Sequence, residues 1–135
     1  MHPARGMWSF AVAKSLIHLV EDDAGLRATL TRLLESGDYP VKQYGSGSEL
    51  PGAADSIGDG FVLLDIDMPG PDGFAVQREL AERGFNAPII LMSGAGDLTV
   101  LALKAGASQF MQKPFGRGEL LSVLGQVSVQ RRPHG

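Results

Sequence analysis

The sequence of 135 residues contains no cysteine, one tryptophan and few aromatic residues, which make up 7% of the chain. The absence of cysteine excludes disulfides and thiolate metal sites, and it fits a reducing compartment. The net charge is only −3, and no cluster of Lys and Arg lies within the chain, which argues against a direct nucleic-acid interface. No apolar run approaches membrane-spanning length. We therefore expect a cytoplasmic protein without a membrane segment, whose hydrophobic content of 44% is enough for one folded domain.

Four short apolar runs each lead into a polar residue that suits phosphoryl chemistry. Buried parallel strands have this apolar pattern, and ligands of open α/β sheets bind at the carboxyl ends of the strands. We therefore expect these polar residues to meet at one edge of a sheet. The runs and the residues that follow them are 15–20 with Glu21 and Asp22, 61–64 with Asp65, 88–92 with Ser93, and 108–112 with Lys113.

Helical patterns occupy the segments between the runs, and Val41–Tyr44 adds a short alternating strand. Asp or Ser residues are the expected N-caps, with Asp22 or Asp23, Asp72 and Asp97 as the clearest, and glycines are the expected stops. The second helix should be short or irregular because Pro51 and Gly52 lie in its first turns. The expected helices are 24–36, about 50–57, 74 to about 82, a short one that Asp97 caps and that runs to 105, and about 118–129. This alternation predicts a doubly wound α/β fold with a mostly parallel five-stranded sheet and helices on both faces.

The residues at the predicted edge form a plausible phosphoryl-transfer site. Glu21, Asp22 and Asp65 would supply oxygen ligands for Mg²⁺, which proteins usually hold with one or two carboxylates, waters and phosphate. An Asp carboxylate can act as a nucleophile and become an aspartyl phosphate. Lys113 would neutralise the acids, while the Ser93 hydroxyl and the Gly94 N–H could donate to a phosphoryl oxygen.

Each of these residues also has an ordinary structural interpretation when it is taken alone. Asp22 and Asp23 could be helix caps, Glu21 a solvated loop acid, Ser93 a turn serine, and Lys113 an exposed loop lysine. Their joint placement on one predicted edge favours a functional site. His18, inside the first strand, is expected to be packed and has no assigned role; Phe110 is expected in the core.

The segments HLVEDD, LLDIDMPGPDG, PIILMSGAGD and KAGASQFMQKPF together resemble the receiver domain of bacterial two-component response regulators. The resemblance covers about residues 15–130, with residues 1–14 as a flexible extension and 131–135 as a flexible tail. It implies a flavodoxin-like fold with strand order 2-1-3-4-5. The GAGD stretch is similar to receivers that read GHGD there, a branch often attached to a helix-turn-helix output domain.

The resemblance also implies a role for each site residue. Asp65 would be the phosphoacceptor, with Mg²⁺ bound by Asp22, Asp65 and the backbone carbonyl of Asp67, and by Glu21 through water. Lys113 would pair with the phosphoryl group, and the Lys113–Pro114 peptide would be cis. Ser93 would be the switch hydroxyl and Phe110 the aromatic side chain that changes rotamer with it.

The implied function is a phosphorylation-activated signalling switch rather than an enzyme. A sensor histidine kinase or a histidine phosphotransfer protein would be the phosphoryl donor, and a downstream protein partner would read the surface of the fourth helix, fifth strand and fifth helix. A weak homodimer is compatible with this. The segment between Gly96 and Lys104 is shorter than usual for the family, so we expect its helix to be short. No output domain follows the last helix, as in a stand-alone receiver or a piece of a longer regulator.

Two alternatives remain open from the sequence. Asp65-Ile-Asp67 is similar to the DxD nucleophile motif of haloacid-dehalogenase-like phosphatases. Those enzymes place their further acidic pair after the lysine, whereas here Glu21 and Asp22 precede the nucleophile. The other alternative is a pseudo-receiver, a binding module that never takes phosphate, although such domains usually lose an acid or the lysine that this chain keeps.

Overall fold

The computed structural model describes residues 14–47, 49–52, 60–67, 73–82 and 87–131, and its centre is a five-stranded sheet in the order β2-β1-β3-β4-β5. All four neighbouring pairs of strands are parallel. The fold class and the strand order are therefore those predicted from the sequence. The strands are β1 (Ile17–Val20), β2 (Val41–Tyr44), β3 (Phe61–Asp65), β4 (Ile89–Ser93) and β5 (Gln109–Gln112).

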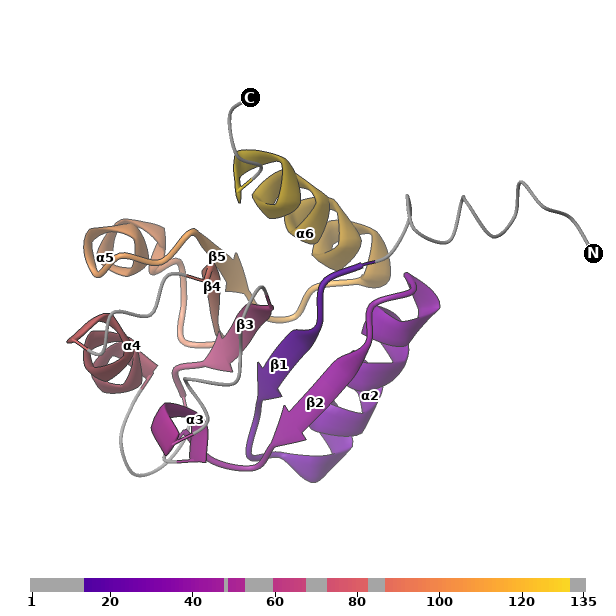
Figure 1. Ribbon diagram of the computed structural model, residues 1–135, viewed down its shortest axis with the longest axis horizontal. Helices are drawn as coiled ribbons and strands as arrows, with labels where there is room; N and C mark the ends of the chain where they lie inside the picture. Colours follow the sequence, from indigo (N-terminus) through magenta and orange to yellow (C-terminus); the bar gives the residue numbers. More distant parts are fainter. Residues whose placement is uncertain (1–13, 48, 53–59, 68–72, 83–86, 132–135) are drawn as a thin grey trace, which may run out of the picture.

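Helices cover both faces of this sheet, as Figure 1 shows: α2 and α6 lie on one side, and α3, α4 and α5 on the other. The two longest helices, α2 and α6, also contact each other. The sheet is therefore enclosed between two layers, and its edge at the carboxyl ends of the strands stays available for a site. The helices are α2 (Ala24–Ser36), α3 (Glu49–Gly52), α4 (Gly73–Glu82), α5 (Thr99–Lys104) and α6 (Arg117–Arg131).

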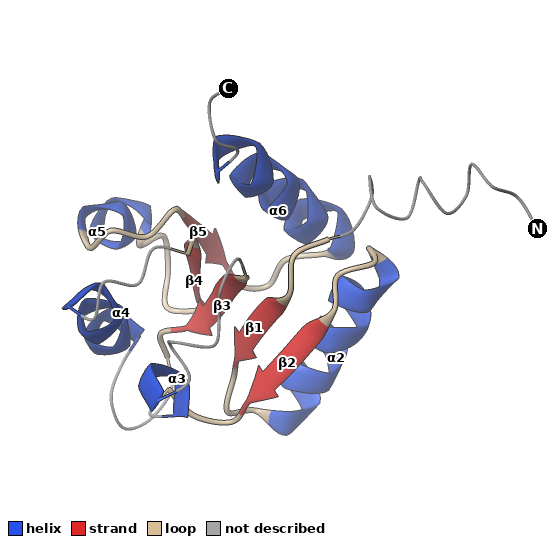
Figure 2. Cartoon of the chain, viewed as in Figure 1, coloured by secondary structure: helices blue, strands red, loops and turns tan. Residues whose placement is uncertain are grey.

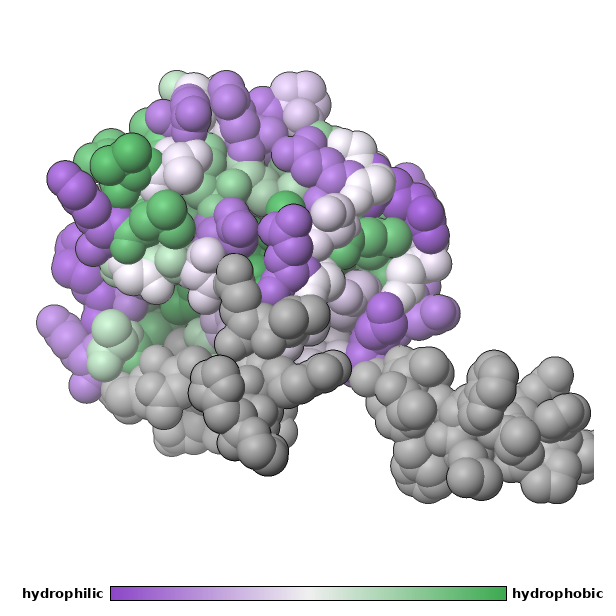
Figure 3. Space-filling model, turned by 90° about the horizontal axis from the view of Figure 1, so that it is seen from above, coloured by the Kyte–Doolittle hydropathy of each residue, from purple (hydrophilic) through white to green (hydrophobic). Residues whose placement is uncertain are grey.

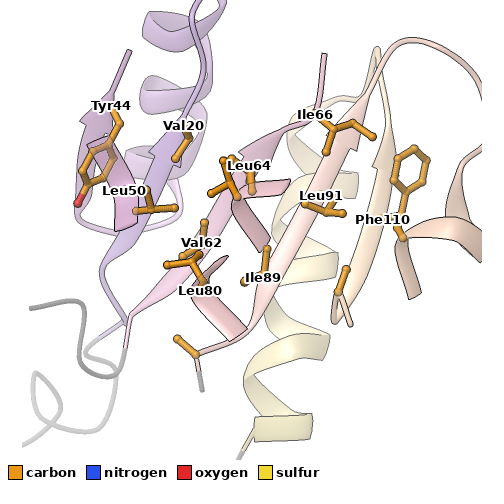
Figure 4. Packing of buried hydrophobic residues seen from close by; sticks show 14 residues of the cluster. Val20, Tyr44, Leu50, Val62, Leu64, Ile66, Leu80, Ile89, Leu91 and Phe110 are labelled. Atoms are coloured by element: carbon orange, nitrogen blue, oxygen red, sulfur yellow. The ribbon is translucent and has the colours of Figure 1, made fainter. Parts of the chain in front are cut away.

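Strand residues alternate between two hydrophobic cores, one on each face of the sheet. In β1, Ile17 and Leu19 face the core under α2 and α6, whereas Val20 faces the core under α3, α4 and α5. Figure 4 shows the second core, where Leu64 and Leu91 of the central strands lie between Leu50, Leu80 and Phe110. Burial on both faces explains why the central strands read as continuous apolar runs.

Most element boundaries agree with the sequence prediction. Helix α2 has the predicted bounds, and Asp23 is its N-cap, with its carboxylate accepting from the Leu26 N–H at 3.0 Å. Helix α4 begins one residue earlier than predicted, and α6 extends from Arg117 to Arg131 rather than from 118 to 129. The predicted second helix begins at Glu49, one residue earlier than predicted, and its described part ends at Gly52. Residues 53–57 of the predicted helix lie outside the described part of the chain, so its length stays a prediction.

The predicted N-cap of α5 differs by one residue. Leu98, not Asp97, is the N-cap, and it has no side-chain cap hydrogen bond. Asp97 instead accepts from the N–H and the hydroxyl of Thr99, so its carboxylate forms a local turn before the helix. Gly106 ends the segment with a φ of 103°, in the region that favours glycine.

Some predictions fall outside the described residues. Asp72 and Gly84, the expected cap and stop of α4, are among them. The extension 1–14 is described only at Lys14 and the tail 131–135 only at Arg131, so both domain boundaries stay predictions. The Lys113–Pro114 peptide is cis, in agreement with the family pattern. Among the described residues, no helix is long and apolar enough to cross a membrane.

Candidate functional site

The predicted site residues meet at the carboxyl edge of the sheet, the edge to which the strand arrows of Figure 2 point. Asp65 and Ser93 are the last residues of β3 and β4, and Glu21 and Lys113 directly follow β1 and β5. Because these four strands are neighbours in the order β1-β3-β4-β5, residues far apart in the sequence are brought together.

An acidic cluster forms the centre of this edge. Glu21, Asp22 and Asp65 each offer a carboxylate oxygen, and these atoms all lie within 4.8 Å of one another. Asp65 and Glu21 are buried, whereas Asp22 is exposed. Since Asp23 is the cap of α2, Asp22 is not needed for that role. A set of hard oxygen donors, open to solvent on one side, fits Mg²⁺.

Lys113 neutralises part of this cluster. Its Nζ lies 3.1 Å from Asp65 Oδ2 and 3.2 Å from Glu21 Oε1. Burial lowers the pKa of Lys113, but its contacts with Asp65 and Glu21 outweigh this effect, so that the pKa is raised. Lys113 is therefore a fixed cation beside the predicted phosphoacceptor.

Glu21 is buried beside another carboxylate, and hydrogen bonds hold both its side chain and its backbone in place. Burial, followed by the neighbouring Asp65 carboxylate, raises the pKa of Glu21 to about 7. The Asp23 N–H donates to Glu21 Oε2 at 3.2 Å, and Arg27 Nη1 donates to the Glu21 carbonyl at 2.7 Å. Both contacts fix the turn that follows β1 and aim the carboxylate at the site.

Ser93 and Gly94, the predicted hydrogen-bond donors to a phosphoryl group, both bind the carboxylate of Asp67. Ser93 Oγ donates to Asp67 Oδ1 and the Gly94 N–H donates to Asp67 Oδ2, each at 2.7 Å. The Asp67 N–H in turn donates to Asp65 Oδ1 at 2.8 Å. The receiver resemblance assigns a role only to the backbone carbonyl of Asp67, and the contacts of its side chain with Ser93 and Gly94 are not predicted from the sequence. The available signal in the sequence is that Asp67 is a second acid, two positions after Asp65.

Two further residues take the positions expected of them. Phe110 is buried in the core under α3, α4 and α5, where Figure 4 shows it beyond Ile66 and Leu91. His18 is buried, and its Nδ1 shares a hydrogen bond of 2.8 Å with the hydroxyl of Tyr44. His18 lies within β1 rather than at its carboxyl end, so it takes no part in the site.

Comparison with known proteins gives a family that fits this geometry. A family model described as the response regulator receiver domain matches residues 17–125. The chain belongs to this family. The receiver is 37% identical over 116 residues to nodulation protein W of Bradyrhizobium diazoefficiens, covering 84% of the chain and 51% of that protein. It is also 38% identical over 120 residues to the transcriptional regulatory protein TdiR of Thauera aromatica, covering 87% of the chain and 53% of that protein.

Solved structures agree with the receiver fold. A crystal structure of FixJ-N matches with a TM-score of 0.81 and 28% identity, covering 90% of this chain and 98% of that one. Full-length FixJ from B. japonicum matches with a TM-score of 0.83 and 31% identity, covering 90% of this chain and 61% of that one. The receiver thus spans about half the length of the curated relatives that it matches, with 51% and 53% of the two above.

Proposed function

We propose that this receiver is a switch that accepts a phosphoryl group on Asp65 from a sensor histidine kinase or a histidine phosphotransfer protein in the cytoplasm. One observation carries the proposal: Lys113 Nζ lies 3.1 Å from Asp65 Oδ2, inside an edge that also holds Glu21, Asp22 and Ser93. A buried carboxylate with a cation on one oxygen and an N–H on the other is held in a single orientation.

The transfer exchanges one bond to phosphorus for another. A carboxylate oxygen of Asp65 attacks the phosphorus of a phosphohistidine, the P–N bond breaks, and the imidazole leaves and takes up a proton from solvent. Lys113 would stabilise the negative charge on the phosphoryl oxygens. The Ser93 hydroxyl and the Gly94 N–H would donate to the same oxygens once the group is in place.

The acidic cluster would hold Mg²⁺ through Glu21, Asp22, Asp65 and the backbone carbonyl of Asp67. The metal would supply positive charge that offsets the repulsion between the carboxylates and the incoming phosphoryl group. In this arrangement Asp22 is the exposed member, and Glu21 and Asp65 are the buried ones. The residues present therefore fit the cofactor of the family.

Phosphorylation would be read by a protein partner on the surface of α5, β5 and α6. Helix α5 has three exposed large apolar side chains, Val100, Leu101 and Leu103. Figure 3 shows hydrophobic side chains gathered on the side of the molecule where α5 lies in Figure 1. Val100 and Leu101 are 65% and 57% exposed, so this helix can lose apolar surface to a partner or to a weak homodimer.

The proposal is tested by labelling with a small phosphodonor. Asp65→Asn should fold normally but should not take up a phosphoryl group from acetyl phosphate and Mg²⁺, as measured by the mass of the intact protein. Asp97→Asn is the matched control, because Asp97 is an exposed acid of the loop after β4 that bonds only locally to Thr99. This control should be labelled like the wild type.

Undiminished labelling of Asp65→Asn would contradict the assignment of the phosphoacceptor. A second measurement separates a switch from a pseudo-receiver. In two-dimensional NMR, beryllofluoride with Mg²⁺, a mimic of the aspartyl phosphate, should shift the signals of Asp65, Ser93 and Lys113. Unchanged spectra would favour a binding module that never takes phosphate.

A further inference from the structure

The carboxylate of Asp67 occupies two of the hydrogen-bond donors that a phosphoryl group on Asp65 would use. Ser93 Oγ and the Gly94 N–H each donate to one of its oxygens at 2.7 Å. The same residue lies beside the phosphoacceptor, because its N–H donates to Asp65 Oδ1 at 2.8 Å. A carboxylate with two oxygens bound in this way resembles two oxygens of a phosphoryl group.

Neither Ser93 Oγ nor the Gly94 N–H can make a strong hydrogen bond to two anions at the same time. A serine hydroxyl has one hydrogen to donate, and a backbone amide has one. The Ser93 oxygen already accepts from the Ala95 N–H at 3.0 Å, so its own hydrogen is left for one anionic acceptor. A phosphoryl oxygen on Asp65 therefore competes directly with Asp67.

We propose that Asp67 is an internal competitor for the phosphoryl-binding donors: it holds Ser93 and Gly94 in the unphosphorylated protein and is displaced when Asp65 is loaded. This inference rests on the proposed function and adds to it a residue that sets how readily the site is loaded. Asp67 is a positioning residue here, since it acts through Ser93 and Gly94.

The burial of the residues supports an exchange of partners. Ser93 is fully buried, so its hydroxyl needs an acceptor in both states, and the free protein supplies Asp67. Asp67 itself is exposed, so that after displacement its carboxylate can be solvated by water. The acidic cluster next to it also favours its departure once a further negative charge arrives.

Removal of the competitor should strengthen binding of the phosphoryl mimic. In Asp67→Ala, the donors of Ser93 and Gly94 are free to bind beryllofluoride, and the affinity at fixed Mg²⁺ should rise by on the order of tenfold, as for one charge-assisted hydrogen bond. The measurement is a titration followed by NMR. Glu35→Gln removes one exposed acid near the far end of α2 and should leave the affinity unchanged.

A double-mutant cycle separates competition from simple charge repulsion. If Asp67 acts through Ser93, the gain from Asp67→Ala should fall by at least half in a Ser93→Ala background. If Asp67 acts only by its negative charge, the gain should be equal in both backgrounds, and the inference is overturned. Asp67→Glu keeps the charge but changes its reach, so it should also bind the mimic more tightly than the wild type.

A second readout needs neither metal nor phosphoryl mimic. The amide proton of Gly94 in the free protein should move upfield in Asp67→Ala, because its bond to a carboxylate is lost, but should stay in place in Ser93→Ala. An unchanged Gly94 signal in Asp67→Ala would overturn the inference. Failure of beryllofluoride to bind the wild type would overturn the proposed function, whereas equal binding to wild type and Asp67→Ala would overturn the inference alone.

Discussion

Lys113 Nζ lies 3.2 Å from Glu21 Oε1, although 92 positions separate the two residues in the sequence. The contact links the carboxyl ends of β1 and β5 across the site. The side chain of Glu21 is only 2% exposed. A carboxylate buried to this extent needs a compensating partner. Lys113 supplies it for Glu21 and, on its other side, for Asp65.

Replacement of Lys113 should therefore destabilise the metal-free protein. Lys113→Met keeps much of the apolar stem but leaves two buried carboxylates without a cation. We expect the free energy of unfolding at pH 7, measured with urea in the presence of a chelator, to fall by about 1–3 kcal/mol. In an Asp65→Asn background the loss should be smaller, because one of the two charges is already gone. Equal losses in both backgrounds would show that Lys113 acts on Glu21 alone.

Two substitutions of glycine by alanine should change the stability of the receiver in opposite directions. A Cβ on Gly73, at the start of α4, would lie 2.9 Å from Ile66 Cα, whereas a Cβ on Gly125, inside α6, would meet nothing within 4 Å. Gly73→Ala should lower the free energy of unfolding by about 1–3 kcal/mol through crowding. Gly125→Ala should raise it by roughly 1 kcal/mol, because alanine is the better helix former. Urea denaturation measures both, and an unchanged Gly73→Ala would mean that Ile66 can move aside.

The sequence predicted the sheet well because its signals are local. Each central strand is an apolar run bounded by a polar residue, and burial between two helical layers requires that pattern. The sequence allows either Asp22 or Asp23 as the cap of α2, and only the structure decides between them, since both side chains suit a cap. The N-cap of α5 was misplaced because Asp97 can bond to Thr99 in a turn as well as in a cap.

The side-chain role of Asp67 could not be derived from the sequence. Its partners, Ser93 and Gly94, lie 26 and 27 positions further along the chain. Which carboxylate at the edge accepts from Ser93 depends on the conformation of the turn after β3, where the Asp67 N–H binds Asp65. No periodicity or spacing encodes such a choice between neighbouring acids, whereas strand order alone brings the acids together.

Burial of His18 should make the stability of the receiver depend on pH. Burial lowers the pKa of His18 below its ordinary value of 6.5, and nearby Lys42 lowers it further. Below pH 6.5 the unfolded chain therefore binds a proton that the folded protein refuses, so the free energy of unfolding should fall as the pH drops through this value. Among the described residues, His18 has two titratable neighbours on β2: Lys42, which acts on it by its charge, and Tyr44, whose hydroxyl shares its hydrogen bond. Glu49 in turn acts by its charge on Tyr44.

His18→Leu isolates this effect. Glu21, whose pKa is raised to about 7, titrates in the same window with the opposite sign, because its folded form binds the extra proton. Both proteins keep Glu21, so the difference between their free energies of unfolding reports His18. That difference should change between about pH 7.5 and pH 5.5, with the wild type losing stability relative to His18→Leu on acidification. Parallel curves would show that His18 keeps its ordinary pKa.

Helix α5 should be weakly protected in the free receiver and should become ordered when the site is loaded. It has six residues, its N-cap makes no side-chain hydrogen bond, and Ala102 is its one buried residue. Val100, Leu101 and Leu103 face solvent instead of a core. A helix with so few buried contacts opens at a low free energy. Loading of Asp65 would pull Ser93 away from Asp67, and Ser93 begins the loop that leads into α5.

Hydrogen exchange measures this directly. Amides of α5 should exchange fast in the free protein and slow down once beryllofluoride and Mg²⁺ are added, because the loop that leads into the helix then binds the phosphoryl mimic through Ser93 and Gly94 instead of Asp67. Helix α2 is the internal control: it has 13 residues, a capped N-terminus and the buried Leu30 and Leu34, so its amides should be protected in both states. Strong and equal protection of α5 in both states would mean that this helix is rigid, and that the signal is a displacement of α5 rather than its ordering.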